Sequence, residues 1–278
     1  MTRSPDIGLP QTSRFSAPDD HPGLDDLVAY LDNVEQLGAF RDLHAIADNW
    51  LAIEPGQSVL DLGCGLGRAT REAANRAGPD GKVMGLDISQ ALLRIAKARS
   101  IDDPAPEYVH GDCSALPFPA ETFDRVRAER LLMHVSDPAV VLSEIGRVLR
   151  PGGRVVLIEP DWGSLEIQHN DQAVCKALSM AFASAIKNPS IGADLKMLSE
   201  QAGLVIVDDK VHFWRSSKYS EIDLTLQFRR MAEIAISQGF HPGSPDAIVN
   251  SLQHGPIAAQ LALTAVVAKK ANSRQAGE

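Results

Sequence analysis

The sequence predicts an α/β protein with a doubly wound, mostly parallel sheet of seven strands and helical lid insertions. Between residues 58 and 158, short apolar segments alternate with amphipathic helical segments, a spacing typical of βαβ units. A glycine cluster follows the first strand, and acidic residues stand at the ends of the next two. Doubly wound sheets bind their ligands at these strand ends. The alternation loosens after residue 160, where we expect the insertions.

Composition narrows the class of protein. The 278 residues are 44% hydrophobic and 23% charged, which fits a packed chain and excludes a disordered one. The 27 basic and 36 acidic residues give a net charge of −9, which argues against nucleic acid as the main partner. Three cysteines are too few for a disulfide scaffold. With neither a signal peptide nor an apolar run of 18 residues in the sequence, we expect a cytoplasmic protein without membrane insertion.

Two segments precede the predicted sheet. Residues 1–23 contain four prolines and few apolar residues, which predicts a mobile arm, either a plain tail or a segment that folds over a ligand. Residues 24–54 are predicted to form a helical cap, because apolar residues recur every three or four positions from Leu27 to Trp50. Gly38 is expected to break or bend this cap.

Residues 55–160 are predicted to form the ligand-binding core. Its expected strands are 58–62, 82–86, 107–110, 123–128 and 154–158, and its expected helices are 68–77, 89–100 and 138–149. Ser89 is a suitable N-cap for the second helix, since its hydroxyl can accept from a free backbone N–H. The Arg-Pro-Gly-Gly run at 150–153 is expected to end the third helix.

Residues 161–270 are expected to complete the sheet and to carry two lid insertions, at about 166–191 and 214–255. The predicted helices here are 173–186, 194–202, 220–238 and 246–252, and the predicted strands are 204–207, 211–214 and 261–268. Residues 271–278 are expected to be a frayed tail.

The most informative segment, residues 59–67, reads Val-Leu-Asp-Leu-Gly-Cys-Gly-Leu-Gly. Glycines between a strand and a helix let a ligand lie against bare backbone, beside the free N–H groups of the helix. Alone, the cluster is also compatible with a tight turn. Asp87 ends the second strand, where doubly wound sheets bind ribose hydroxyls, and Gly-Asp-Cys-Ser at 111–114 follows the third. Together these features favour a nucleoside-containing ligand.

A dinucleotide site is the competing interpretation. Its Gly-x-Gly-x-x-Gly fingerprint would need a third glycine at position 68, where the chain has Arg68. The third glycine stands at 67 instead. The mismatch disfavours a nicotinamide- or flavin-dependent oxidoreductase.

Further motifs follow in order: Gly-Leu-Asp-Ile-Ser at 85–89, Gly-Asp-Cys-Ser-Ala-Leu-Pro-Phe at 111–118, Phe-Asp at 123–124, His-Val-Ser-Asp-Pro at 134–138 and Arg-Val-Leu-Arg-Pro-Gly-Gly at 147–153. With the glycine segment, they resemble the class I S-adenosylmethionine-dependent methyltransferases. The resemblance covers residues 55–160 and is strongest to the small-molecule type, similar to ubiquinone/menaquinone-biosynthesis C-methyltransferases.

The resemblance implies a cofactor, S-adenosylmethionine, with S-adenosylhomocysteine as product. Gly63, Gly65 and Gly67 would admit its methionine part, Asp61 would orient that loop, and Asp87 would accept from the ribose. Ile88 and Asp112 would contact adenine, beside the Cys113 backbone. Ala128 and Glu129 would border the methionine end. The implied acceptor is a small, apolar or aromatic metabolite, methylated at carbon, oxygen or nitrogen by a monomer or homodimer.

Catalysis and acceptor binding leave alternatives open. Glu129, His134 and Asp161 are candidate general bases, although His134 equally fits a structural or lining role and Glu129 an arginine pair. The candidate acceptor-lining residues are Trp162, Phe182, Phe228 and Arg229. No Cys/His spacing predicts a metal site. A protein that binds the cofactor without transferring the methyl group, as a scaffold or a rearrangement catalyst, is the remaining alternative.

Overall fold

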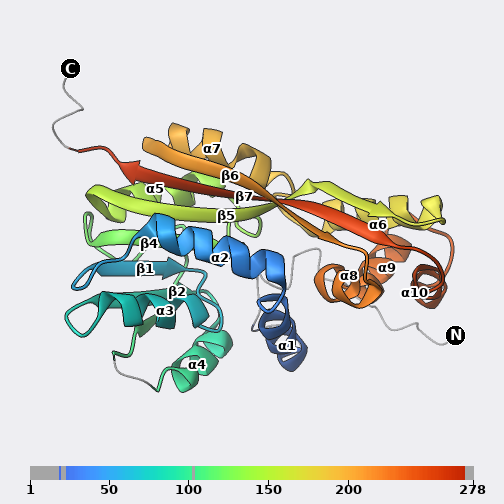
Figure 1. Ribbon diagram of the computed structural model, residues 1–278, viewed down its shortest axis with the longest axis horizontal. Coiled ribbons are helices and arrows are strands. Elements are labelled where there is room, and N and C mark those ends of the chain that lie inside the picture. The colour runs from blue at the N-terminus through green and yellow to red at the C-terminus, as the bar shows by residue number, and fades with distance from the viewer. Residues whose placement is uncertain (1–18, 20–22, 102–103, 273–278) are drawn as a thin grey trace, which may run out of the picture.

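The computed structural model describes residues 19, 23–101 and 104–272. Its seven strands form one sheet in the order β3-β2-β1-β4-β5-β7-β6 (Figure 1). The strands are β1 (Ser58–Leu62), β2 (Lys82–Asp87), β3 (Glu107–His110), β4 (Phe123–Glu129), β5 (Leu149–Gln168), β6 (Leu204–Ser216) and β7 (Ala258–Lys270). Strands β1 to β5 pair in parallel, and β7 runs antiparallel to both β5 and β6. The predicted fold class is confirmed.

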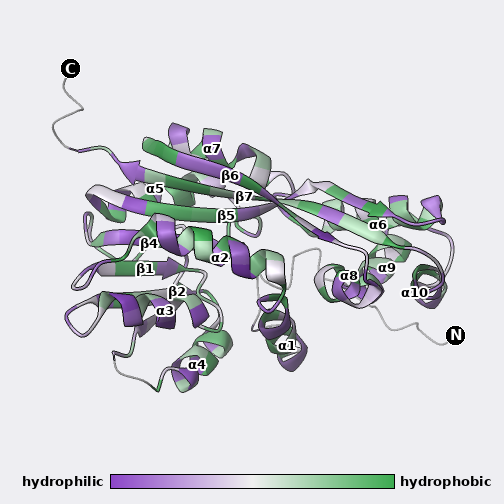
Figure 2. Ribbon diagram, viewed as in Figure 1, coloured by the Kyte–Doolittle hydropathy of each residue, from purple (hydrophilic) through white to green (hydrophobic). Residues whose placement is uncertain are grey.

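Helices cover both faces of the sheet. They are α1 (Leu24–Val34), α2 (Gly38–Leu51), α3 (Arg68–Ala77), α4 (Gln90–Arg99), α5 (Pro138–Val148), α6 (Gln172–Ala185), α7 (Ile191–Gln201), α8 (Tyr219–Leu226), α9 (Phe228–Ser237) and α10 (Pro245–Gln253). Apolar side chains alternate along the central strands: Val59 packs against α3, and Leu60 faces the core shared with α5 and α7. Hydrophobic residues occupy much of β5 and β7, whereas the helices carry both hydrophobic and hydrophilic residues (Figure 2).

The last three strands are longer than the sequence pattern predicts. Strand β5 has 20 residues, and β6 and β7 have 13 each. They extend past the central sheet and carry α6, α8, α9 and α10 at their far end (Figure 1). The predicted boundaries were wrong here because β5 contains a bulge between Asp161 and Glu166, which breaks its alternation. In β6, the Asp-Asp-Lys run at 208–210 reads as a turn but lies beside a bulge on an exposed edge strand.

Two predicted helix breaks had different outcomes. The break near Gly38 is confirmed, because α1 ends at Val34 and α2 begins at Gly38. The single helix expected over 220–238 was wrong. It is two helices, because Gln227 adopts a left-handed conformation with φ 49°. The Asp223 carboxylate accepts from the backbone N–H of Phe228 at 3.0 Å and so caps the second helix.

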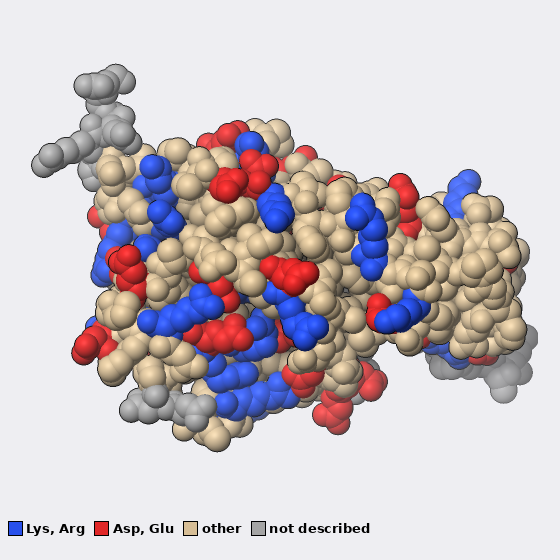
Figure 3. Space-filling model, viewed as in Figure 1, with Lys and Arg blue, Asp and Glu red and all other residues tan. Residues whose placement is uncertain are grey.

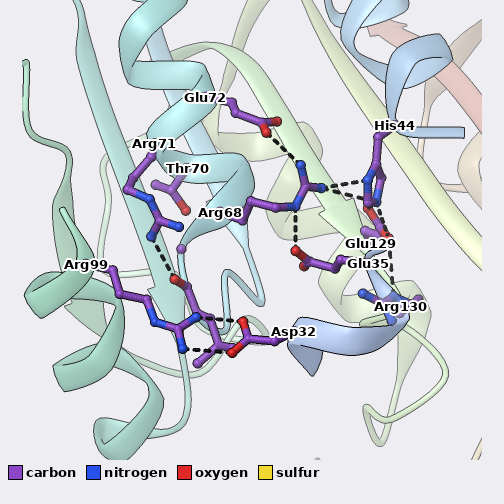
Figure 4. Close-up of polar contacts among 12 residues, drawn as sticks. Asp32, Glu35, His44, Arg68, Thr70, Arg71, Glu72, Arg99, Glu129 and Arg130 are labelled. Carbon is purple, nitrogen blue, oxygen red and sulfur yellow. Dashed lines mark hydrogen bonds and ion pairs between the residues drawn. The ribbon is translucent and has the colours of Figure 1, made fainter. Parts of the chain in front are cut away.

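Ion pairs fasten the two cap helices to the central domain. The Asp32 carboxylate in α1 accepts two hydrogen bonds from Arg99 in α4, at 2.7 and 2.8 Å (Figure 4). Glu35, the residue directly after α1, pairs with Arg68 at the start of α3. Acidic and basic side chains are interspersed over this face of the molecule (Figure 3). The cap is thus fixed over the carboxyl ends of the first strands.

Two sequence-based expectations, the N-terminal arm and the C-terminal tail, lie mostly outside the described residues. The expected arm is described only at Asp19, which accepts from the backbone N–H groups of Gln90 and Ala91, and at Gly23. Of the expected tail, only residues 271 and 272 are described. Among the described residues, no helix combines the length and apolarity that crossing a membrane requires.

Candidate active site

A cavity of about 500 Å³ lies at the carboxyl ends of the central strands, beneath the cap helices. One end is formed by the glycine loop after β1, the end of β2 and the loop after β3. Most of the rest of the lining comes from the loop after β4, the middle of β5, the cap, α8 and β7. The lining is more apolar than polar. Of the predicted site residues, it includes Gly63, Gly65, Asp87, Ile88, Asp112, Cys113, Glu129, His134 and Trp162.

The three glycines of the loop have different roles, although all have left-handed φ values of 52–72°. A Cβ atom on Gly67 would lie 2.2 Å from the Tyr108 hydroxyl oxygen, so this glycine is required by packing. A Cβ atom on Gly63 would touch Leu131 at 3.0 Å. A Cβ atom on Gly65 would meet no protein atom within 4 Å. Gly65 therefore leaves free space beside the backbone, as a ligand cradle requires.

Asp87 and Asp61 hold the glycine loop and the start of α3 in place through hydrogen bonds. The Asp87 carboxylate accepts from the backbone N–H groups of Gly65, at 2.8 Å, and Ser89, at 2.9 Å. Each oxygen keeps a lone pair for a further donor, such as a sugar hydroxyl. Burial raises the pKa of Asp87. Asp61 lies outside the lining and accepts from the Thr70 hydroxyl at 2.6 Å, and burial raises its pKa to about 6.

The region beyond Asp87 suits a flat heterocycle. The Ile88 side chain is 47% exposed, although it is a large apolar residue, and it lines the cavity. Asp112 also lines the cavity and uses one carboxylate oxygen to accept from the Ser114 backbone N–H at 2.8 Å. The other oxygen remains available for an amino group. An apolar surface and a hydrogen-bond acceptor in the same cavity suit adenine, which has a flat ring and an amino group.

Glu129 lies in a dense network of charges (Figure 4). Its carboxylate accepts from His44 Nε2 at 2.9 Å and pairs with Arg130 at 3.2 Å and with Arg127. Arg68 in turn donates to His44 Nδ1 at 2.7 Å. Although burial alone would raise it, these partners hold the pKa of Glu129 well below its usual range. A carboxylate with so low a pKa is a poor general base. Its role is structural, because it holds α2 against the loop after β4.

The other two candidate bases also have unfavourable surroundings. Burial, reinforced by the nearby charges of Arg130 and Lys187, lowers the pKa of His134 to about 3. Asp161 is absent from the cavity lining, whereas Pro160 and Trp162 belong to it, because neighbouring side chains of a strand point to opposite faces. The Asp161 carboxylate instead accepts from the Gly163 backbone N–H at 3.1 Å.

The predicted acceptor-lining residues fall into two groups. Trp162 lines the cavity and stacks on Phe182, with ring centroids 5.1 Å apart and ring planes 6° apart. Phe182 is buried behind it and supports the indole. Phe228 is fully buried outside the cavity, and Arg229 is exposed and paired with Asp246. The structure therefore brings only Trp162, backed by Phe182, to this cavity. Ala128 is likewise buried and outside the lining.

Comparisons with known proteins agree with this geometry. Residues 60–157 match the family model of a methyltransferase domain. The chain is 37% identical, over 174 residues, to demethylmenaquinone methyltransferase of Lactococcus lactis, covering 56% of this chain and 69% of the relative. A second relative is an uncharacterised 37.1 kDa protein in transposon TN4556 of Streptomyces fradiae. It is 37% identical over 248 residues, which are 88% of this chain and 71% of the relative.

The chain belongs to the class I S-adenosylmethionine-dependent methyltransferases. It is a small-molecule methyltransferase, similar to those of quinone biosynthesis. This membership replaces the dinucleotide-dependent oxidoreductase as an interpretation of the glycine loop. Arg68, which breaks the dinucleotide fingerprint, binds Glu35 and His44 of the cap instead.

Solved structures show that the methyltransferase fold extends over most of the chain. YcgJ protein from Bacillus subtilis covers 82% of it with a TM-score of 0.59 and 18% identity, and the aligned part is 98% of YcgJ. The [4+2]-cyclase SpnF covers 84% with a TM-score of 0.53 and 20% identity, and 82% of SpnF is aligned. Because a cyclase shares the fold, the architecture alone does not imply methyl transfer.

Sequence reasoning missed several residues that line this methyltransferase's cavity, among them Tyr30, Leu31, Phe40, Arg130, Met133, Lys187, Thr225, Leu261 and Leu263. Tyr30, Leu31 and Phe40 lie in the cap, whose helical pattern was visible but whose inner face was not. Leu261 and Leu263 lie on β7, which the pattern placed correctly as a strand. Lys187 follows α6, in a segment without any recognisable motif.

Glu159 and Asn188 fix the loop after β4 by binding its backbone N–H groups and its backbone carbonyl oxygens, respectively. The Glu159 carboxylate accepts from the backbone N–H groups of Leu131, at 2.9 Å, and Leu132, at 2.6 Å. The Asn188 side-chain amide donates to the backbone oxygens of Leu132, at 2.8 Å, and Val135, at 2.9 Å. Both the donors and the acceptors of the loop are thus satisfied by side chains. The loop presents Met133 and His134 to the cavity as a fixed wall.

Proposed function

We propose that this methyltransferase binds S-adenosylmethionine at the glycine-loop end of the cavity and a flat, apolar or aromatic acceptor at the Trp162 end. The observation that carries the proposal is the continuity of the cavity. One space of about 500 Å³ connects the loop and acidic residues that suit a nucleoside with an apolar region that suits a small molecule. The volume is in the range usual for small-molecule sites.

The cofactor end has the groups that this cofactor requires. Free space beside Gly65 accommodates the methionine part, Asp87 takes the ribose hydroxyls, and Ile88 and Asp112 contact adenine. Asp61 and Gly67 act indirectly, by holding the start of α3 and by packing against Tyr108. When bound, S-adenosylmethionine supplies an activated methyl group on a sulfonium.

The protein contributes mainly position and the exclusion of water. Met133 and Trp162 face the acceptor, and the Trp162 indole N–H donates to the Met133 sulfur at 3.3 Å, which fixes both side chains. Leu261 and Leu263 of β7 add apolar surface to the cavity wall, and Thr225 of α8 also belongs to the lining. Helices α6 and α8 therefore act as the acceptor lid. The oligomeric state that we expect is a monomer or a homodimer.

Formation of S-adenosylhomocysteine tests this proposal. The protein is incubated with S-adenosylmethionine and a panel of flat acceptors, such as naphthols, hydroquinones and indoles, and the product is quantified by mass spectrometry. Turnover by the wild-type protein and by Asp80→Asn, an exposed turn variant, together with its loss in Asp87→Asn, supports the assignment. Equal turnover in all three proteins contradicts the cofactor site. Cofactor binding without any S-adenosylhomocysteine would favour the non-transfer alternative.

A further inference from the structure

At the acceptor end of the cavity, the carboxylates have hydrogen-bond or ion-pair partners, whereas one cation, Lys187, has no carboxylate partner among the described residues. Lys187 lines this end, and the described residues give its ammonium the Ser136 hydroxyl as hydrogen-bond partner, at 3.2 Å, and no ion-pair partner. The carboxylates of the same cavity are all engaged. Glu35 pairs with Arg68, and Glu129 pairs with Arg127 and Arg130.

The remaining three carboxylates of the lining accept backbone hydrogen bonds. Asp137 caps α5 by accepting from the Ala139 and Val140 N–H groups, and Asp87 and Asp112 lie at the cofactor end. The acceptor end therefore has a cation that the described residues leave without a carboxylate. The Lys187 side chain is exposed where it lines the cavity, and a charge-assisted hydrogen bond to a ligand anion is stronger than its bond to the neutral Ser136 hydroxyl.

Lys187 is held in place over the cavity. Its neighbour Asn188 donates its backbone N–H to the Met133 oxygen at 3.1 Å, in addition to the two side-chain bonds to the same loop. Pro189 accepts from the Trp162 backbone N–H at 2.7 Å. The segment that carries Lys187 is thus tied to both walls of the acceptor end. A tethered cation of this kind is suited to binding a charged group in one position.

Arg130 adds a second positive group on the same side. It has a left-handed φ of 51°, lies over the Phe40 ring at 5.3 Å from the centroid, and lines the cavity. Both cations lie close enough to His134 to lower the pKa of its imidazole. Burial and these two cations keep the His134 imidazole neutral, and the same two positive charges favour a negatively charged ligand group on this side of the cavity.

Resting on the function proposed above, we infer that the acceptor is an anion: a flat, apolar molecule with a carboxylate or an ionised hydroxyl, bound opposite Lys187. The acidic proton leaves to solvent before transfer, so the site needs no general base. The anion donates an electron pair to the methyl carbon, and the electrons of the broken carbon–sulfur bond remain on sulfur. The positive charge of the sulfonium and the negative charge of the acceptor disappear together.

Calorimetry on the full chain saturated with S-adenosylhomocysteine tests the inference. The two probes are 2-naphthoate and the neutral 2-naphthylmethanol, which share one ring system. The wild-type protein is expected to bind 2-naphthoate about tenfold more tightly, which corresponds to about 1.4 kcal/mol, close to the lower end of the range for one charge-assisted hydrogen bond. Lys187→Met should abolish this preference, whereas Lys187→Arg should keep most of it. Lys176→Met, at an exposed position on α6 outside the cavity, is the matched control.

Three results would overturn the inference: equal affinity of the wild-type protein for both probes, an unchanged preference in Lys187→Met, or no binding of either probe. The titration with S-adenosylhomocysteine is read separately. If that ligand does not bind, the proposed function itself fails. If it binds and the preference for the anion is absent, only the present inference fails.

Discussion

The Glu159 carboxylate accepts a 2.6 Å hydrogen bond from the backbone N–H of Leu132, and this contact lies fully inside the protein. It fixes the loop that forms one wall of the cavity. Burial raises the pKa of Glu159 from 4.5 to about 8, although the backbone N–H groups act in the opposite direction. The carboxyl group therefore links the stability of the fold to pH.

The sign of this linkage follows from the raised pKa. The folded protein holds the Glu159 proton more tightly than the unfolded chain does, so the contribution to stability is complete below pH 4.5 and is lost as the pH rises to about 8. Within that window, the loss is about 1.4 kcal/mol per pH unit. Glu159→Gln cannot titrate. Urea unfolding at pH 5, 6, 7 and 8 should show a wild-type stability that falls relative to the variant, and parallel profiles would refute this linkage.

Substitution of Gly65 should affect the cofactor without unfolding the sheet. In Gly65→Leu, the side chain enters the space assigned to the methionine part, so affinity for S-adenosylhomocysteine should fall at least about a hundredfold. Gly78→Leu is the matched control, because Gly78 also has a left-handed φ, of 69°, and open space around it, but lies outside the cavity. Both variants lose stability through backbone strain, by about 1–3 kcal/mol, and the strain is larger in Gly78→Leu because the ψ of Gly78 is −175°. Equal cofactor affinity in the two variants would contradict the site.

The ion pairs of the cap should contribute to cofactor retention. Arg99→Met removes both hydrogen bonds to Asp32, and since the pair is partly exposed we expect a loss of only about two- to fivefold in cofactor affinity. The difference from wild type should shrink in high salt, where exposed charges are screened. Lys97→Met, at an exposed position of the same helix, serves as control. Titrations at low and high salt measure both effects, and a salt-independent deficit would argue against an electrostatic cap.

Trp162 should matter for the acceptor and not for the cofactor. Trp162→Ala removes the cavity wall and its stacking on Phe182, so kcat/KM for a flat acceptor should fall at least about tenfold while S-adenosylhomocysteine affinity stays within about twofold. Phe213→Ala removes an exposed aromatic ring of β6 and should change neither value. Steady-state kinetics and calorimetry give the two readouts. A parallel loss of both quantities in Trp162→Ala would place the indole at the cofactor end.

Much of the cofactor half is predictable from the sequence, because its signals are local. The strand from 58 to 62, the glycine loop and the Ser89 N-cap all lie where the pattern places them, since each depends on neighbouring residues. The different roles of the three glycines are not local. The position of Tyr108, some forty residues later, decides that Gly67 is a packing glycine and Gly65 a cradle.

The acceptor half is far less predictable, because it is assembled from distant segments. Phe228 and Arg229 satisfied the apolar and basic criteria for a substrate pocket, yet they lie on α9 away from the cavity. Lys187 has no distinguishing sequence context, and the segment that carries it is tied to the loop after β4 by Asn188, far away in the sequence. Glu129 was a reasonable candidate base until its three partners were visible.

The central claim is that the cavity is a site for S-adenosylmethionine, and one calorimetric experiment tests it most directly. The dialysed protein is titrated with S-adenosylmethionine, with S-adenosylhomocysteine and with NADH. The account predicts micromolar, one-to-one binding of the two sulfur-containing ligands and no heat from NADH. Binding of NADH with silence from both sulfur-containing ligands would contradict it.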